Sequence, residues 1–343
     1  NNLSGEAKRT AAKLADEYLN NHFPAANNIL LVPELHTRNL NYLDNITTLK
    51  EIISANGKRE VIFGSIDPEL NDKLNLDLPN GDQIEIQPIY KDADNVKTKY
   101  GFCPDLIIVN NDFTAGSPEI LQNINQEVIP PVGMGWYQRR KYNHFQAYNL
   151  LCNDFAKEFN FDPFLISTEI GHCGKINFKE RKGLECIAIG VEKLITRLKK
   201  KYAAIGIKED PYVYIKADRG TYGMGIMIAR SGEEIMSINK KTRNKMDIIK
   251  SKVNNQEVLL QEGIATIDQL NGSAAEPFIY QIGGQTCGLI IRSNANRDSL
   301  INLNAPGAVF TAGDAVSEFN NNLAAYDVIA RIASLATIYE SDF

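Results

Sequence analysis

The chain has 343 residues, of which 43% are hydrophobic and 23% charged, and its formal net charge is −5. This length exceeds what one hydrophobic core usually serves, so we expect two domains or three. The small negative charge gives no general basic field, which argues against nucleic acid as a partner. The longest apolar runs, such as 28–33 and 105–110, are too short to cross a bilayer, so no membrane association is expected.

The N-terminus and the cysteines bear on the cellular compartment. The first residues have the pattern of an amphipathic helix, not the apolar core of a signal peptide. No two cysteines have the CxxC spacing of a zinc site or a redox dithiol, and scattered free thiols fit a reducing cytoplasm. His172 directly precedes Cys173, but neighbours in sequence do not by themselves form a catalytic dyad. The five cysteines are Cys103, Cys152, Cys173, Cys186 and Cys287.

The first third of the chain alternates between helix and strand patterns. Such alternation predicts an open α/β sheet, whose ligands usually bind beyond the carboxyl ends of the strands. Helix patterns cover residues 5–22 and 38–55, and strand patterns cover 28–33, 60–66, 81–90 and 105–110.

The rest of the chain changes character twice. Prolines and glycines between residues 128 and 145 indicate a boundary. Helix patterns follow it, and after Pro211 alternating strand patterns dominate. The helix patterns are 142–160, 180–202, 241–253 and about 321–339, and the strand patterns are 211–216, 225–230, 256–262, 276–282 and 286–293.

The stretch "YIKADRGTYGMGIMIAR" places a lysine at the mouth of a glycine-rich turn between two strands. Lys216 ends the first strand, and Gly220, Gly223 and Gly225 follow it. Glycines let a backbone wrap an anion with its N–H groups, and a lysine adds a charge for a phosphate oxygen. The spacing matches neither a P-loop nor GxGxxG, and a strand follows the turn. By itself the stretch also fits an ordinary hairpin.

Three later features favour a phosphate site over the hairpin. An acid with two amide oxygens suits Mg²⁺, and an arginine suits a transferring phosphoryl group. Each feature also has an explanation without a ligand: a solvated strand end, a structural ion pair, or ordinary turn chemistry before Ala-Pro-Gly. The features are a strand ending in Gln261 and Glu262, a strand pair carrying Glu276 and Arg292, and the run "NLNAPG" with Asn302 and Asn304.

In this order, these motifs resemble the ATP-grasp superfamily over the residues after about 205. The resemblance implies that the lysine contacts the phosphates of ATP, that the glycine-rich flap covers them, and that the "QE" hinge reads the adenine and ribose. Asn302 stands where the superfamily has a glutamate, so Glu276 is expected to be the main acidic ligand of Mg²⁺. The implied ATP contacts are Lys216, Gly220, Thr221, Tyr222, Gly223, Gly225, Gln261 and Glu262, and the implied metal ligands are Glu276, Asn302 and Asn304.

A narrower resemblance covers most of the chain. The runs "GWYQRRKYNHF", "KADRGTYGMGIM", "EPFIY" and "NLNAPGAVF" are similar to the proteobacterial glutamate–cysteine ligases of the Acidithiobacillus ferrooxidans type. That resemblance implies ATP-dependent joining of L-glutamate to L-cysteine through a γ-glutamyl phosphate, the first step of glutathione biosynthesis. Phosphoryl transfer needs positioning and charge neutralisation, so Lys216 and Arg292 are the expected catalytic residues. Arg139 and Arg140 are the candidates for holding the glutamate carboxylates.

We therefore predict an α/β (α+β) fold with three parts. They are an N-terminal α/β domain (1–127), a helical linking and substrate region (128–205), and an ATP-grasp nucleotide-binding domain with antiparallel sheets (206–343). Three alternatives stay open: another ATP-grasp ligase such as a glutathione synthetase, a non-catalytic nucleotide-binding protein, which Asn302 favours, and a dinucleotide-dependent oxidoreductase. The absence of a strand–GxGxxG–helix unit weakens the last. Whether the chain forms a homo-oligomer is also open.

Overall fold

The structure is a computed structural model that describes residues 3–34, 39–78, 81–220, 225–247, 256–300, 302–313 and 322–343. The chain divides into two compact units. Unit 1 contains Asn1–Gly135, Phe278–Ile290 and Thr311–Asn320, and unit 2 contains Trp136–Pro277, Ile291–Phe310 and Asn321–Phe343. The predicted class, an open α/β region followed by antiparallel sheets, is confirmed. The domain bounds at residues 127 and 205 stay a prediction.

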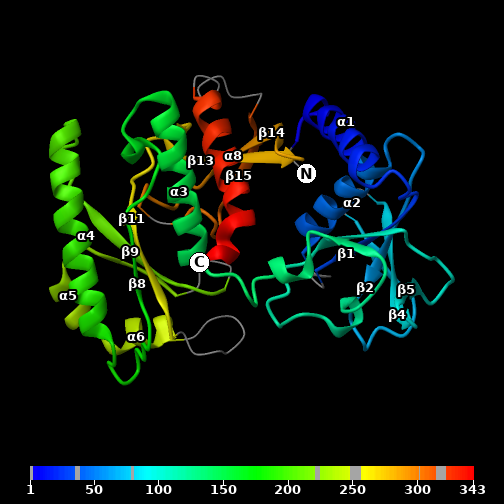
Figure 1. Ribbon diagram of the computed structural model, residues 1–343, viewed down its shortest axis with the longest axis horizontal. Coiled ribbons are helices and arrows are strands. Elements are labelled where there is room, and N and C mark those ends of the chain that lie inside the picture. Colours follow the sequence, from blue (N-terminus) through cyan, green and yellow to red (C-terminus); the bar gives the residue numbers. More distant parts are fainter. Residues whose placement is uncertain are drawn as a thin grey trace. The chain divides into compact units, whose positions relative to one another are not determined.

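Unit 1 is built on a largely parallel sheet (blue to cyan in Figure 1). Its helices are α1 (Gly5–His22) and α2 (Leu40–Ser54), and its strands are β1 (Asn28–Pro33), β2 (Glu60–Ser65), β3 (Leu74–Asp77), β4 (Gln83–Asp92), β5 (Asn95–Thr98), β6 (Leu106–Asn110) and β7 (Glu127–Ile129), with short turns η1 (Glu119–Leu121) and η2 (Val132–Met134). The strand order is β3-β4-β2-β1-β6-β7, with β5 paired to β4. Only β3 and β5 run antiparallel to their neighbour.

The apolar runs recognised in the sequence form the centre of this sheet. Strand β1 lies between β2 and β6, and its residues 29–32 are fully buried. Strands in parallel sheets are covered on both faces, which is why this run is continuously apolar instead of alternating. Leu31 and Phe63 pack with Leu43 and Ile46 of α2 in one core. The predicted strands at 28–33, 60–66 and 105–110 are confirmed.

Unit 2 contains a fully antiparallel sheet in the order β10-β9-β11-β8. Its elements are β8 (Ile170–Cys173), β9 (Tyr212–Ala217), β10 (Ile226–Ala229) and β11 (Val258–Gly263), with helices α4 (Leu184–Ile205), α5 (Gly232–Met236) and α6 (Lys240–Asp247). Ile187, Val191 and Leu194 of α4 pack against Ile215 and Leu260 in one core. Helix α4 therefore covers one face of the sheet (Figure 1).

The remaining elements form a third sheet and a helix pair. The sheet has the order β12-β13-β14-β15, and its residues are divided between the two units. In unit 2, helices α3 and α8 lie side by side through Ala147, Cys152, Ile332 and Ala336 (green and red in Figure 1). The elements are β12 (Gln269–Leu270), β13 (Ser273–Ile282), β14 (Gln285–Ser293), β15 (Val309–Ala312), α3 (Lys141–Phe159) and α8 (Leu323–Tyr339), with η3 (Pro163–Leu165) and η5 (Glu340–Asp342).

The cysteines differ from the expectation in one respect. Cys173 of β8 and Cys186 of α4 form a disulfide, so the prediction of scattered free thiols is wrong for this pair. The fold brings a strand and a helix together across 13 residues of sequence, which no local spacing reveals. Cys103, Cys152 and Cys287 are free.

Within the described residues, no helix is long and apolar enough to span a bilayer.

Unit 2 provides a matched test of its core. Phe178 is fully buried in the α4 core, whereas Phe159, at the end of α3, is 64% exposed. We expect Phe178→Ala to lower the free energy of unfolding by about 3–5 kcal/mol, because it removes a buried ring and leaves a cavity. Phe159→Ala is the control and should cost less than about 1 kcal/mol. Urea denaturation of both variants measures this, and equal losses would contradict the placement of the core.

Candidate active site

Lys216 lies near the end of β9, on the face of the sheet that α4 does not cover. Strands β9 and β11 pair Lys216 with Leu259 and Tyr214 with Gln261. The Lys216 Nζ atom donates to Gln261 Oε1 at 2.7 Å and lies 5.0 Å from the Tyr214 ring centroid. Burial lowers the pKa of Lys216 to about 8. Among the described residues no carboxylate pairs with this ammonium group, so an anionic ligand would stabilise its charged form.

A second partly buried lysine, Lys141, reaches the same loop from the first residue of α3. Its Nζ atom donates to the carbonyl oxygens of Ala217 at 3.0 Å and Gly220 at 2.7 Å. Burial lowers the pKa of Lys141 to about 8; the charge of Asp218 opposes this shift, and the charge of Lys216 adds to it. Two partly buried cations that repel each other at a glycine-rich loop would be stabilised by a polyanion. The sequence analysis missed Lys141, which stands beside two arginines in "YQRRKY".

The two described glycines of the loop both need the freedom of glycine. Gly220 has φ +90° and Gly225 has φ +66°, and a Cβ atom on Gly225 would come 3.2 Å from the Cβ of Ala217. The Ala217 N–H donates to the Gly225 carbonyl at 3.0 Å and closes the base of the loop. Thr221, Tyr222 and Gly223 lie outside the described residues, so their contacts with ATP stay predictions.

Gln261 and Glu262, which the sequence analysis grouped as one hinge, point to opposite faces of β11. Gln261 faces Lys216, whereas Glu262 is 5% exposed and faces α4. Its Oε1 accepts from the Tyr202 hydroxyl and its Oε2 from the Glu169 N–H, both at 3.1 Å. Burial raises the pKa of Glu262, and these hydrogen bonds oppose that shift. Because both oxygens bond to protein groups, the structure does not bring the Glu262 carboxylate to Lys216.

Glu276 and Arg292 lie together on the neighbouring strands β13 and β14. The Arg292 Nε atom donates to Glu276 Oε1 at 2.7 Å, and a second guanidinium nitrogen contacts the same oxygen. Tyr214, whose ring lies beside Lys216 Nζ, donates its hydroxyl to the Leu300 carbonyl at 2.6 Å. Burial raises the pKa of Tyr214, and the negative charge of Glu276 acts in the same direction. The structure thus places Glu276 within electrostatic reach of the strand that carries Lys216.

The "NLNAPG" segment has the predicted alternation. Asn302 and Asn304 are exposed and Leu303 between them is buried. The Asn302 Oδ1 atom accepts the Asn304 N–H at 2.9 Å, which is turn chemistry. Asn294, fully buried just after β14, donates to the Leu303 carbonyl at 3.2 Å and holds the segment beside the end of that strand. The sequence analysis did not single out Asn294.

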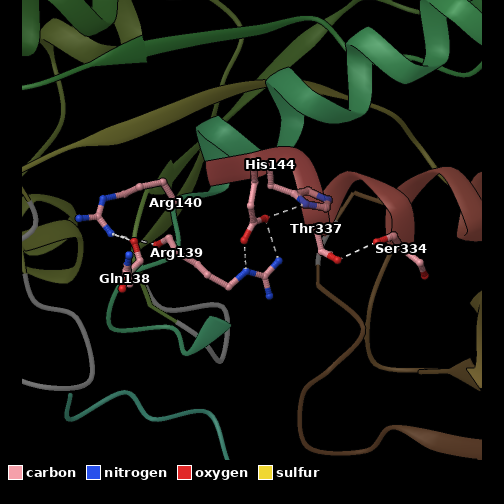
Figure 2. Close-up of polar contacts among 7 residues, drawn as sticks. Gln138, Arg139, Arg140, His144, Ser334 and Thr337 are labelled. Carbon is pink, nitrogen blue, oxygen red and sulfur yellow. Dashed lines mark hydrogen bonds and ion pairs between the residues drawn. The ribbon is translucent and has the colours of Figure 1, made fainter. Parts of the chain in front are cut away.

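Arg139 and Arg140 are both engaged with protein groups. Arg139 Nε donates to Glu340 Oε1 at 2.5 Å, and Arg139 Nη2 donates to Glu340 Oε2 at 3.0 Å. His144 Nδ1 lies 3.1 Å from the same Oε2, so Arg139 and His144 converge on one carboxylate (Figure 2). Arg140 turns the other way, donates to the Gln138 carbonyl, and has its Nε 3.7 Å from Glu257 Oε2. Arg139 therefore ties the start of α3 to the C-terminal turn.

Comparison with known proteins identifies the family. The family model described as "GshA: Glutamate-cysteine ligase" matches residues 1–341. The chain belongs to the glutamate–cysteine ligase family. Members of this family are carbon–nitrogen ligases, which agrees with the enzyme class predicted from the sequence.

A solved structure agrees with this family membership. It comes from Methylobacillus flagellatus KT and is provisionally named a gamma-glutamylcysteine synthetase. It aligns with a TM-score of 0.88 and 36% identity over 99% of this chain and 83% of that one. The D-alanyl-alanine synthetase A of Vibrio cholerae aligns with a TM-score of 0.41 and 11% identity over 89% of this chain and 81% of that one, a likeness too low to establish a shared fold. A search of curated proteins finds no match.

The Arg139–Glu340–His144 cluster gives a stability prediction that depends on pH. Burial raises the pKa of Glu340, but the hydrogen bonds and charges of His144 and Arg139 outweigh it, so the pKa lies below its usual value of 4.5. A carboxyl with a lowered pKa stabilises the fold above its unfolded pKa and loses this effect as the pH falls through its folded value. We expect Glu340→Gln to cost about 2 kcal/mol at pH 7 and the difference to shrink below about pH 4.5.

The control for this prediction is Asp342→Asn, an exposed carboxylate in the same turn. It should leave the unfolding free energy within about 0.5 kcal/mol of the unmodified protein at every pH. The measurement is urea denaturation at several pH values. If the difference in unfolding free energy between Glu340→Gln and the unmodified protein stays constant down to pH 3, the charge of the Glu340 carboxylate contributes nothing to stability.

Proposed function

We propose that this member of the glutamate–cysteine ligase family uses ATP to join the γ-carboxylate of L-glutamate to the amine of L-cysteine. The observation that carries the use of ATP is the pair of partly buried lysines, Lys216 and Lys141, at the opening of a glycine-rich loop. Two partly neutralised ammonium groups without carboxylate partners among the described ion pairs are suited to the charges of a triphosphate. Gln261 holds Lys216 in place, and glycine-rich segments can offer backbone N–H groups to phosphate oxygens.

The residues near β13 and β14 fit a magnesium ion. The two described contacts between Arg292 and Glu276 both go to Oε1, so Oε2 of this partly exposed carboxylate is the oxygen proposed for the cation. The exposed Asn304 amide offers a second hard oxygen, whereas the Asn302 oxygen already accepts a hydrogen bond. Glu276 and Asn304 are therefore the main candidates, with Asn302 third. When bound, Mg²⁺ would neutralise charge on the β- and γ-phosphates.

The reaction has two steps in this proposal. A γ-carboxylate oxygen of glutamate attacks the γ-phosphorus of ATP, the bond to the β-phosphate oxygen breaks, and ADP leaves. The cysteine amine then attacks the acyl carbon of γ-glutamyl phosphate, loses a proton, and releases inorganic phosphate. Lys216 and Arg292 are the proposed catalytic residues, since each offers positive charge for the transferring phosphoryl group.

Glutamate recognition needs cations for its carboxylates, and the two candidate arginines differ. Arg139 makes a bidentate ion pair with Glu340, so moving it to a substrate would leave a nearly buried carboxylate without that partner. Arg140 has one ion pair at 3.7 Å to a partly exposed glutamate and is the better candidate. A cytoplasmic location is part of the same proposal; the three free cysteines support it and the disulfide does not.

A test of this function is an ADP-release assay over the twenty amino acids, alone and in pairs, with ATP and Mg²⁺. We expect ADP release to require glutamate and the full turnover to require cysteine as well. Lys216→Ala should lower the rate at least about 100-fold, because the charge acts on the transferring phosphoryl group. The exposed Lys193→Ala on α4 is the matched control and should keep the rate. Full activity in Lys216→Ala would remove its phosphate role, and ATP binding without turnover would indicate a non-catalytic nucleotide-binding protein.

The lowered pKa values predict that ATP binding takes up protons. Both lysines have a pKa of about 8 in the free protein, so near pH 8 each is about half protonated. Bound phosphates favour the charged form, so the affinity is highest below about pH 8 and falls as the pH rises further. Calorimetry of ATP binding at pH 8, in buffers with different ionisation enthalpies, should find uptake of up to about half a proton for each lysine.

Substitutions assign this uptake to the two lysines. Lys216→Met and Lys141→Met should each reduce the number of protons taken up, whereas the control Lys193→Met should not change it. Two results would contradict the placement of the phosphates between these lysines. One is that ATP binding to the unmodified protein takes up no protons, and the other is that proton uptake persists when Lys216→Met and Lys141→Met are combined.

A further inference from the structure

Three potential metal ligands converge on one face of the antiparallel sheet of unit 2. His172 belongs to β8, Asp218 directly follows β9, and Glu257 directly precedes β11. One ligand atom from each residue lies within 4.8 Å of the other two. None of the three belongs to the residues proposed above for ATP, Mg²⁺ or glutamate.

The strand register explains this convergence. His172 is opposite Leu259 in the β8–β11 pair, so it shares a face with Glu257, two residues before Leu259. The Asp218 N–H donates to the Glu257 carbonyl at 3.0 Å, which continues the β9–β11 pairing by one residue and places these two side chains opposite each other. Cys173 points to the other face, towards α4, where it forms its disulfide. The cluster is therefore fixed by backbone pairing and needs no particular loop conformation.

The Asp218 carboxylate is unusual because it is buried and only partly bonded. The residue is 2% exposed, and its Oδ1 accepts the Tyr142 N–H at 2.8 Å. Within the described part of the chain, Oδ2 and both imidazole nitrogens of His172 make no hydrogen bond. The Tyr142 ring lies 4.9 Å from the imidazole and restricts its orientation. A carboxylate on a residue this deeply buried is costly unless a cation or hydrogen-bond donors balance its charge.

The neighbouring cations satisfy the cluster incompletely. Arg140 lies 3.7 Å from Glu257, a long ion pair in which the glutamate side chain is 41% exposed. Lys141 is close enough to affect Asp218, but its Nζ donates to the carbonyls of Ala217 and Gly220. Neither cation forms an ion pair with Asp218 among the described contacts. The two carboxylates and the imidazole thus remain able to turn towards a shared ion.

We propose that His172, Asp218 and Glu257 bind a divalent transition-metal cation, with water completing its coordination. One imidazole nitrogen and two carboxylate oxygens are ligands for Zn²⁺ and Mn²⁺, whereas Mg²⁺ prefers an all-oxygen set. Glu276 belongs to β13 and Asn304 to the segment before β15, so this site shares no ligand with the proposed magnesium site. Because Asp218 directly precedes the glycine-rich loop, the cation would tie the start of that loop to β8 and β11.

The experiment is a calorimetric titration of the full chain with Zn²⁺, without nucleotide and with Mg²⁺ in large excess. It uses untagged protein in a Cys103→Ser background, since the exposed free thiol of Cys103 is a competing ligand. We expect one Zn²⁺ per chain, and His172→Asn and Glu257→Gln should each weaken binding at least about tenfold. His172 is exposed and Glu257 partly exposed, so both variants should fold, which their melting temperatures without metal check.

Matched controls replace the same residue types away from the cluster. His22→Asn at the end of α1 and Glu158→Gln near the end of α3 are both exposed and should leave the Zn²⁺ affinity unchanged. Mn²⁺ binding followed by electron paramagnetic resonance should respond to the same two variants. Absence of stoichiometric binding, or equal affinity in the cluster variants and the controls, would overturn the proposal. The titration needs neither ATP nor turnover, so its result does not depend on the ligase proposal.

Discussion

The antiparallel register of β8, β11 and β9 decides which side chains can meet at the candidate active site. Side chains alternate between the faces of a strand, so a shift by one residue would move every group to the opposite face. The register is held because Ile215 and Leu260 must pack against α4 on the covered face. Lys216 and Gln261 are consequently left together on the open face. The apolar packing of one face thus positions the charged groups of the other.

The same alternation separates the two residues of the "QE" hinge. Adjacent residues in a strand cannot both face one ligand with their side chains. Glu262 faces α4, where Tyr202 and the Glu169 backbone satisfy its carboxylate, and only Gln261 remains beside Lys216. Any contact of Glu262 with a nucleotide would therefore go through its backbone. These two positions thus combine a buried structural acid with one residue, Gln261, that orients the Lys216 side chain.

The sequence predicted the elements with strong apolar patterns and missed those without them. The apolar runs at 28–33 and 105–110 form strands of the parallel sheet. Such strands are buried on both faces, so their apolar character is continuous and easy to recognise in the sequence. Strand β8 was missed because "IGHC" has no apolar alternation and pairs with β11, a strand that follows it by more than eighty residues. Lys216 could be singled out because it stands beside glycines. Lys141 could not, since its significance comes from burial against a loop far away in the sequence.

The candidate arginines and lysines differ in whether a carboxylate of the protein balances their charge. Arg139 with Glu340, and Arg292 with Glu276, satisfy each other inside the protein, which stabilises the fold whether or not a ligand binds. Lys216 and Lys141 have no such partners among the described ion pairs, and burial makes their charged forms unfavourable. A protein keeps such groups where a ligand supplies the missing charge, since otherwise they only reduce stability. Among the described ion pairs, the unpaired lysines are therefore stronger candidates for ligand contacts than the ion-paired arginines.

Helix α3 connects this site to the end of the chain. Its first N–H groups lack partners within the helix, and Asp218 satisfies two of them: Lys141 N–H donates to its carbonyl at 3.0 Å and Tyr142 N–H to its carboxylate at 2.8 Å. The same end of α3 is held to the C-terminal turn by Arg139 and His144 (Figure 2). The start of the glycine-rich loop, the start of α3 and the last residues of the chain are thus one connected structure. Asp218 makes the link between the strand end and α3, because its carbonyl and its carboxylate both accept from the first turn of that helix.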